Sequence, residues 1–491
     1  MRAAKIDLST EEQERRVLAK RLVAPITTFA RQELVEKIPA HHRAQLSSAA
    51  ERTLFEWLEK RLADALTQCA ELHFRAFVAF AGSSRREHDI ARLAVDYVTP
   101  CAKRLLQLIE ANPPLGKVLT TLVQHWLAAV GELLERFARD RRVLAKHFRV
   151  GGAGAKIRGL RIGLSDPKAG GRSVMELTFN DGGRIVYKPR DVLGEVDWFS
   201  LLNWANEEGW EPPLRIVRAL ARDGYGWLEG IRHLPCHARS EVRRYYYRSG
   251  GLLCLMHISG MTDCHQENVI ALGAHPVLVD AETLGSFATS EDHQASCHKV
   301  TTIFRTGYLP VPTEVDPLAI DYSWSALDPM LQRNGDNLHL PRLNDQFLSS
   351  EDFTAEIVQG FRAMTNLVWS NRVDRKLKDH LSRIARCHPR RVLFRNTRTY
   401  VQIMEASLAP DVMLSGVTRS AKLIRLIWRK DIDPIIARQE FLALSQLDIP
   451  FFPHDGSRDH RALASKKTII EDILKDLPAQ LQLLKLALSK R

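Results

Sequence analysis

The first 150 residues carry apolar side chains every three or four positions. The two clearest stripes are Leu54, Leu58, Leu62, Leu66, Cys69 and Leu72, and Val118, Leu122, Trp126, Val130, Leu133 and Phe137. Because an α-helix turns once in 3.6 residues, each stripe covers one side of a helix. Gly82-Ser-Ser84 and Pro113-Pro114 predict breaks between helices. We therefore expect residues 1–150 to form a helical segment whose aromatic side chains are core.

The pattern changes near residue 150, where short strand-like runs begin. A hairpin is predicted from 173–179 and 184–187, joined by the turn Asn180-Asp-Gly-Gly183. Lys188 ends the second strand, and Pro189 stops it before a helical stretch. The glycines at 151–154 and 170–171 form no Gly-x-Gly-x-x-Gly, which favours loop flexibility over phosphate binding. We assign residues 151–235 to a small lobe.

Helical patterns dominate again from residue 236 to 491. Residues 240–258 predict a buried helix, and the apolar run Val277-Leu-Val279 predicts a buried strand. Helical patterns therefore lie on both sides of a region with strands, and the expected fold class is α+β with extensive helical N-terminal and C-terminal parts.

Composition narrows the class of protein. No apolar run approaches the roughly 18 residues that cross a bilayer, and the N-terminus has no apolar signal core, so we expect no membrane partner and a cytoplasmic location. The net charge of +12 comes from basic residues interleaved with acids along helices, which disfavours a nucleic-acid partner. Seven scattered cysteines fit a reducing compartment, and the Cys-His pairs at 236–237, 297–298 and 387–388 lack the ligand spacing of a zinc site.

The stretch Asp263-Cys-His265-Gln-Glu-Asn268 carries the most specific chemistry, because a second acid, Asp280, follows its Asn after twelve residues. Asp-x-x-x-x-Asn followed by a strand and an Asp is the catalytic-loop and metal-ligand pattern of kinases. Asn268 and Asp280 offer the hard oxygen atoms that Mg²⁺ prefers. Asp263 or His265 can orient a substrate hydroxyl and accept its proton.

The alternative interpretation of these residues is a solvated acidic loop after a helix. For any single residue of the set, this structural interpretation has the same weight as a catalytic or metal-binding role. The ordered set, with a buried strand delivering Asp280, favours the kinase-like interpretation.

Asp-x-His-x-x-Asn in place of His-Arg-Asp is the variant found in lipid kinases. The wider stretch from Trp227-Leu-Glu to Asp280-Ala-Glu282-Thr-Leu resembles the dehydratase domain of class II lanthipeptide synthetases, the LanM family. Those enzymes phosphorylate Ser and Thr of a precursor peptide and then eliminate the phosphate. The resemblance implies a lipid-kinase-like bilobal core, with ATP and Mg²⁺ as cofactors.

The resemblance also assigns roles to residues around the loop. Lys188, in Tyr-Lys-Pro-Arg, would bind the nucleotide phosphates, with Glu195 as a tentative helix partner. Glu282 would join Asn268 and Asp280 at the metal. Residues 283–299 would form an activation-like loop, and 304–310 resemble a further family segment.

Four residues are assigned to the elimination step by the same resemblance. Arg391 and Thr397 have the family's six-residue spacing, and Arg391 suits a departing phosphate because its planar fork binds two oxygens. The alternation of cations and apolar residues over 391–400 also fits a half-buried strand. Asp166 matches the family's Asp-x-His upstream of Lys188, but Lys168 replaces the His. A charged lysine is a poor base, although it can grip phosphate or donate a proton.

These observations leave three hypotheses for function. The first is a stand-alone LanM-like dehydratase acting on a ribosomal precursor peptide with a leader, together with separate modifying enzymes because the family's zinc-dependent cyclase is not expected here. The second is a peptide kinase that stops before elimination. The third is a catalytically silent peptide-binding protein.

Overall fold

The computed structural model describes residues 8–80, 87–152, 156–287, 302–310, 325–327, 337–386, 390–391, 394–395, 397–429, 432–454 and 460–489. The chain forms two compact units. Unit 1 contains Met1–Pro189 and Leu393–Phe451, and unit 2 contains Arg190–Val392 and Phe452–Arg491. The division into regions 1–150, 151–235 and 236–491 stays a prediction.

Unit 1 begins with the helices that the sequence predicted. They are α1 (Leu8–Leu22), α2 (Ala24–Lys37), α3 (Ala40–Arg43), α4 (Ser48–Phe80), α5 (Glu87–Val98), α6 (Cys101–Ala111) and α7 (Pro113–Phe148). The prolines at 113 and 114 open α7, where a missing backbone donor costs nothing. The predicted break there is confirmed, whereas the one at 82–84 lies outside the described residues. Both apolar stripes are buried apart from Leu72.

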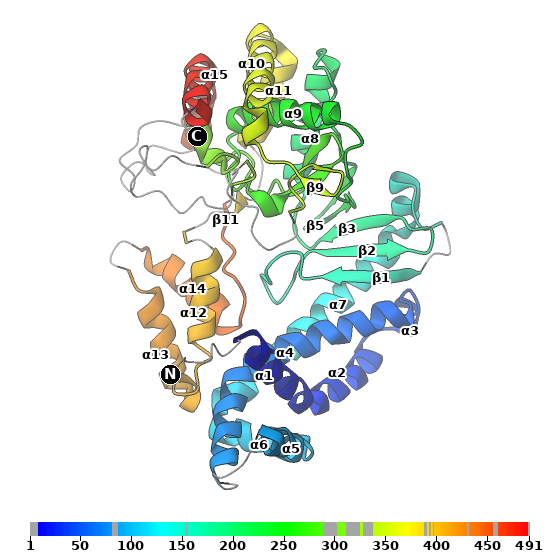
Figure 1. Ribbon diagram of the computed structural model, residues 1–491, viewed down its shortest axis with the longest axis vertical. Coiled ribbons are helices and arrows are strands. Elements are labelled where there is room, and N and C mark those ends of the chain that lie inside the picture. Colours follow the sequence, from blue (N-terminus) through cyan, green and yellow to red (C-terminus); the bar gives the residue numbers. More distant parts are fainter. Residues whose placement is uncertain are drawn as a thin grey trace. The chain divides into compact units, whose positions relative to one another are not determined.

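A small antiparallel sheet follows in unit 1. Its strands are β1 (Ile157–Ile162), β2 (Met175–Phe179) and β3 (Arg184–Lys188), with β2 in the centre of the three. The predicted hairpin is therefore confirmed. Asp181 closes its turn by accepting the amide of Gly183 at 2.9 Å. Helix α7 lies along these strands (Figure 1), and the rings of Phe137 and Phe179 stack with centroids 5.8 Å apart.

The last part of unit 1 is helical: α12 (Thr397–Ala406), α13 (Gly416–Ile427) and α14 (Pro434–Ser445), with a 3₁₀ turn η5 (Val412–Leu414). Tyr400 and Ile403 enter a common core at helical spacing. Arg395 pairs at 2.9 Å with the fully buried Glu440, which also accepts the Tyr400 hydroxyl. A strand over residues 391–400 is therefore wrong beyond its start, because burial every third or fourth residue selects a helix.

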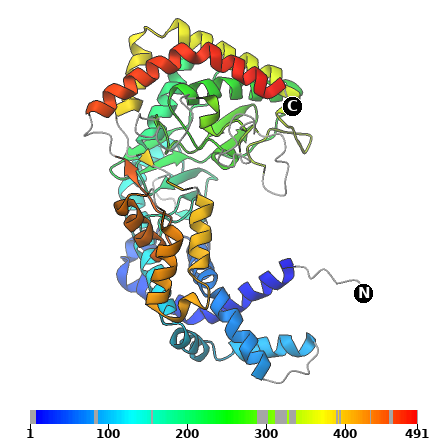
Figure 2. The same ribbon diagram turned by 90° about the vertical axis from the view of Figure 1, so that its left-hand side faces the viewer.

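Unit 2 consists of helices around several hairpins. Its helices are α8 (Leu193–Glu207), α9 (Arg239–Ile258), α10 (Thr354–Ser370), α11 (Arg375–Arg386) and α15 (His460–Ser489), and its 3₁₀ turns are η1 (Gln266–Asn268), η3 (Ile303–Thr306) and η4 (Glu351–Phe353). Its strands are β4 (Ala219–Arg222), β5 (Tyr225–Glu229), β6 (Val269–Leu272), β7 (His275–Leu278), β8 (Arg342–Leu343), β9 (Gln346–Phe347), β10 (Arg390–Arg391) and β11 (Pro453–His454). Helix α15 runs alongside α10 in Figure 2.

Helix α9 is the buried helix that the sequence predicted, and it packs against α10 through two glycines. A Cβ at Gly250 would lie 2.0 Å from the carbonyl oxygen of Ile357. A Cβ at Gly360 would lie 1.8 Å from the carbonyl oxygen of Tyr247. The two backbones therefore touch, and any side chain at either glycine would separate the helices.

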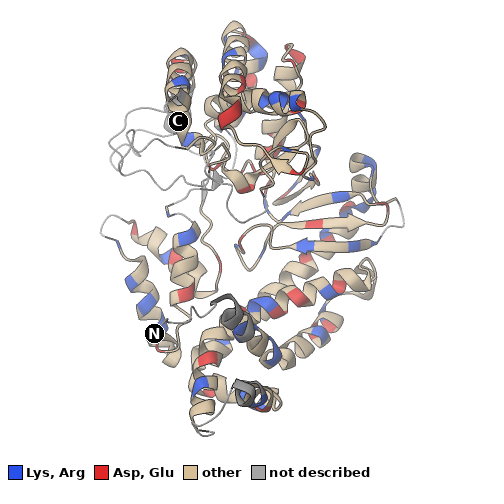
Figure 3. Ribbon diagram, viewed as in Figure 1, with Lys and Arg blue, Asp and Glu red and all other residues tan. Residues whose placement is uncertain are grey.

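Helices with small antiparallel sheets confirm the α+β class, while the lipid-kinase-like bilobal core stays a prediction. Figure 3 shows basic and acidic residues interspersed along the helices, as the sequence indicated. Within the part of the chain that the structure describes, no helix combines the length and apolar character that membrane crossing requires.

The glycine contact gives a first prediction, for Gly360→Ala. Its methyl group meets backbone rather than a flexible side chain, so we expect a loss of roughly 3 kcal/mol or more and a melting temperature several degrees lower. The control is Gly416→Ala in α13, where a Cβ meets nothing within 4 Å. Thermal unfolding followed by circular dichroism compares them. Equal melting of Gly360→Ala and the unsubstituted chain would contradict the backbone contact.

Candidate active site

The β6–β7 hairpin of unit 2 brings the predicted loop Asn next to the predicted metal Asp. Val269 lies opposite Leu278 in the ladder. The ladder continues for one more pair beyond the strands, because the Val279 amide donates to the Asn268 carbonyl at 2.9 Å. Asp280 follows immediately. The separation of twelve positions between Asn268 and Asp280 is thus closed by one tight hairpin.

The loop before the hairpin is held in an unusual conformation. Asp263 has a φ of +61°, which residues with a Cβ rarely adopt and Asp tolerates better than most. Two neighbouring segments fix it. The Cys264 amide donates to the Thr306 carbonyl at 2.8 Å, and the Thr283 hydroxyl donates to the Thr262 carbonyl. Strain of this kind persists only where the surroundings impose it, and it concentrates at functional sites.

Within this loop, Asp263, His265 and Asn268 contact one another. His265 Nε2 lies 3.5 Å from Asp263 Oδ1, and Asn268 Nδ2 donates to the Asp263 carbonyl at 2.8 Å. His265 Nδ1 accepts the Glu267 amide at 3.2 Å. His265 Nε2 also lies 3.4 Å from Asn268 Nδ2, so this ring nitrogen faces both the Asn268 amide and the Asp263 carboxylate. The amide nitrogen of Asn268 is turned toward Asp263, so its oxygen points away from that carbonyl.

Sequence reasoning missed Arg190, which lies at the centre of the acids of this site. Its guanidinium donates to Glu195 and to Asp280, each at 2.6 Å, and its Nε lies 3.4 Å from Glu282. Burial alone would disfavour the charge, but the three carboxylates, Asp280 foremost, raise the pKa of Arg190 above its usual value. The signal was present in Tyr-Lys-Pro-Arg, but its partners lie 5, 90 and 92 positions away.

Helix α8 begins beside these carboxylates. Gly194 leaves room for the carbonyl oxygen of Ala281, which would lie 3.0 Å from a Cβ there. Glu195, in the first turn, is 1% exposed. Glu195, the expected helix acid, is therefore part of the site, where it accepts a hydrogen bond from Arg190.

Asn268, Asp280 and Glu282 have the oxygen donors that suit a Mg²⁺ ion. All three come from the hairpin and the residues directly after it. Among the described residues, no group of three or more His, Cys, Asp or Glu side chains is already arranged around a metal position. Any ion here therefore needs the Asn268 oxygen, and it must share Asp280 with Arg190.

In unit 1, Asp166 and Lys168 lie on a loop that Asp448 anchors. The Asp448 carboxylate accepts the amides of Gly170 and Gly171, at 2.5 and 3.0 Å. The Ile449 amide donates to the Pro167 carbonyl at 2.8 Å. Asp166 is exposed and Lys168 half-buried. Asp448 is buried, and sequence reasoning gave it no role.

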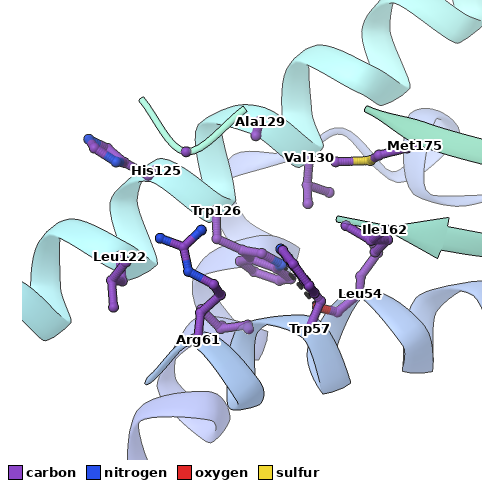
Figure 4. A pocket seen from close by; sticks show the side chains of 12 residues that line it. Leu54, Trp57, Arg61, Leu122, His125, Trp126, Ala129, Val130, Ile162 and Met175 are labelled. Atoms are coloured by element: carbon purple, nitrogen blue, oxygen red, sulfur yellow. Dashed lines mark hydrogen bonds between the residues drawn. The ribbon is translucent and has the colours of Figure 1, made fainter. Parts of the chain in front are cut away.

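A small hollow lies beside this loop, between α4 and α7 (Figure 4). Arg61 extends into it from α4, and Trp126 of α7 donates from Nε1 to the Leu54 carbonyl at 3.0 Å. His125 borders it, with Nδ1 3.9 Å from Asp448 Oδ2. Burial lowers the pKa of His125, so the ring is neutral near pH 7. It is an imidazole beside Gly171 of this loop, and no sequence motif indicated it.

The remaining predicted residues are placed as follows. Lys188 is the last residue of β3 and is buried. Arg391 lies in β10, opposite Pro453 in the two-stranded sheet with β11, and its side chain is outside the described residues. Thr397 is the first residue of α12. The expected loop 283–299 is described only as far as residue 287.

Comparisons with known proteins agree with the resemblance found in the sequence. A family profile described as "Domain of unknown function (DUF4135)" matches residues 112–337 and 330–455. The lacticin 481/lactococcin biosynthesis protein LcnDR2 of Lactococcus lactis subsp. lactis is 22% identical over 382 residues, covering 68% of this chain. The chain spans 40% of that relative's length. The predicted resemblance to the LanM dehydratase domain is confirmed.

The anchoring of the Asp166 loop gives a second prediction, for Asp448→Asn. Replacing one carboxylate oxygen by an NH₂ group removes an acceptor of the Gly170 and Gly171 amides, at a cost of roughly 1–3 kcal/mol. We expect these amides to exchange about 10- to 100-fold faster in hydrogen-exchange mass spectrometry. Asp433→Asn, at the start of α14, is the control and should leave them unchanged. Unaltered exchange in Asp448→Asn would refute the anchor.

Proposed function

The chain belongs to the DUF4135 family, and on that premise we propose that it is a peptide dehydratase of the LanM type. It phosphorylates Ser or Thr of a ribosomally made precursor peptide with ATP and Mg²⁺, and then eliminates the phosphate to give a dehydroamino acid. The observation that carries the proposal is the β6–β7 hairpin, which sets Asn268 beside Asp280 directly after the strained Asp263 loop.

For the phosphorylation step, Asn268, Asp280 and Glu282 would hold a divalent ion through oxygen atoms. Such an ion would supply positive charge for the nucleotide phosphates. Asp263 orients the substrate hydroxyl and accepts its proton as the oxygen–phosphorus bond forms. His265 Nε2 lies 3.5 Å from Asp263 Oδ1, so the ring borders the carboxylate and limits the positions it can take. Lys188, at the end of β3, binds the nucleotide phosphates.

In the elimination step, a base removes the α-proton of the phosphorylated residue and the phosphate leaves from the β-carbon. Arg391 binds the departing phosphate through its planar fork, with Thr397 as a hydroxyl partner. Asp166 and Lys168 belong to the loop that Asp448 anchors. Lys168 binds the phosphate or donates a proton to it. A charged lysine cannot serve as the base, which favours a second candidate function, a peptide kinase that releases phosphopeptide.

A substrate assay gives the third prediction. The protein is incubated with ATP, Mg²⁺ and a candidate ribosomal precursor peptide that carries its leader, and the mass of the peptide is measured by mass spectrometry. Loss of water from the peptide supports the full cycle, whereas an accumulated phosphopeptide supports the kinase. We expect Asp280→Asn to lower either rate by roughly a hundredfold or more, because a metal ligand is lost where charge develops.

Two controls sharpen the assay. Asp433→Asn carries the same exchange of an acid for an amide, but at the start of α14, and should retain the full rate. Synthetic phosphopeptide supplied without ATP isolates the elimination step. Unchanged peptide mass in every reaction, with no ATP consumed, would leave only the silent peptide-binding hypothesis.

A further inference from the structure

Arg190 lies among three carboxylates, two of which belong to expected metal ligands. Its side chain is 17% exposed and contacts three carboxylates, those of Glu195, Asp280 and Glu282. Three acids and one arginine leave a formal charge of −2 at this position. Without a metal ion, the guanidinium is the positive charge that offsets the repulsion between these three carboxylates.

The contact with Asp280 is specific. Asp280 Oδ1 accepts both Arg190 Nη2, at 2.6 Å, and the Glu282 amide, at 2.9 Å. The first bond fixes the carboxylate relative to Arg190, and the second fixes it relative to the next acid. A metal ion that binds Asp280 therefore meets an oxygen already engaged by a positive charge.

Arg190 also connects the carboxylates to a rigid element. Glu195 is almost fully buried in the first turn of α8, and it binds the same Nη2 that binds Asp280. A buried acid cannot leave its partner without a large cost, so it holds the guanidinium in place. Because Gly194 has no side chain, the same turn packs closely against the Ala281 carbonyl. The orientation of Asp280 thus depends on α8 through Arg190.

We propose that Arg190 is a positioning residue and an internal counter-ion of the metal site: it holds Asp280 and Glu282 in place before the divalent cation binds, and the cation binds in competition with it. This inference rests on the proposed function, because it requires a metal ion at Asp280. A purely structural ion pair would affect stability alone and would leave the affinity for metal unchanged.

The test is calorimetric titration of the full chain with Mn²⁺, which accepts the same oxygen ligands as Mg²⁺. For Arg190→Gln we expect Mn²⁺ to bind about tenfold more tightly, because a positive charge a few Å from the ion has been removed. The metal-free variant should melt at a lower temperature than the unsubstituted chain. Mn²⁺ should raise its melting temperature by more than it raises that of the unsubstituted chain.

Two further variants complete the design. Arg215→Gln removes the same charge from the Arg215–Glu229 pair, elsewhere in unit 2, and should leave the Mn²⁺ affinity unchanged. Glu195→Gln keeps the expected metal ligands but removes one acid that competes for Arg190. It should weaken Mn²⁺ binding several-fold, and it provides the test if Arg190→Gln does not fold.

The outcomes separate the two claims. Equal or weaker Mn²⁺ binding by Arg190→Gln, or unchanged or tighter binding by Glu195→Gln, overturns the role of Arg190 even if the metal site is real. Asp280→Asn reports on the site itself. If the unsubstituted chain binds no Mn²⁺ that this substitution abolishes, the metal site of the proposed function fails, and the role of Arg190 fails with it.

Discussion

The short ladder between β6 and β7 is the interaction on which the site depends. A two-stranded hairpin fixes which residues face each other, and the bond from the Val279 amide to the Asn268 carbonyl extends that register by one pair. Asn268 precedes β6 and is opposite Val279, so Asp280 is the first residue beyond the last bonded pair. The ladder therefore fixes the backbones of the two expected metal ligands within one residue of each other in register.

The rest of unit 2 supports this hairpin and the loop before it. Arg248, in the buried helix α9, donates to the Ala274 carbonyl at the turn of the hairpin, at 2.6 Å. Helix α9 is itself fixed by backbone contact with α10 at Gly250 and Gly360. Thr306 and Thr283 hold the strained Asp263 loop from two sides. A rigid helix pair thus carries a strained loop, which is how proteins place catalytic groups with little freedom.

Local patterns in the sequence predicted the elements well where one physical cause dominates. Helical spacing located α4, α7 and α9, and the turn Asn180-Asp-Gly-Gly183 located the β2–β3 hairpin. The catalytic loop was recognisable because Asp263, Asn268 and Asp280 occur in a fixed order. The same reasoning allowed a strand over 391–400, where alternating cations outweighed the helical spacing of Tyr400 and Ile403.

Local sequence patterns could not predict contacts between residues that are far apart in the chain. Arg190 and Asp280 are 90 residues apart, and Asp448 binds glycines 277 and 278 positions away. No periodicity records such pairs, because each partner alone looks like a surface charge. The backbone contact of α9 with α10 is of the same kind, since a glycine in a helix indicates close packing without naming its partner.

The central claim is that Asn268 and Asp280 bind one divalent ion. Crystals grown with Mn²⁺ and a non-hydrolysable ATP analogue would test it through the anomalous signal of the metal. The account predicts a peak roughly 2.2 Å from both Asn268 Oδ1 and an Asp280 carboxylate oxygen, in contact with phosphate oxygens of the nucleotide. A nucleotide bound with its metal away from these two side chains would contradict it.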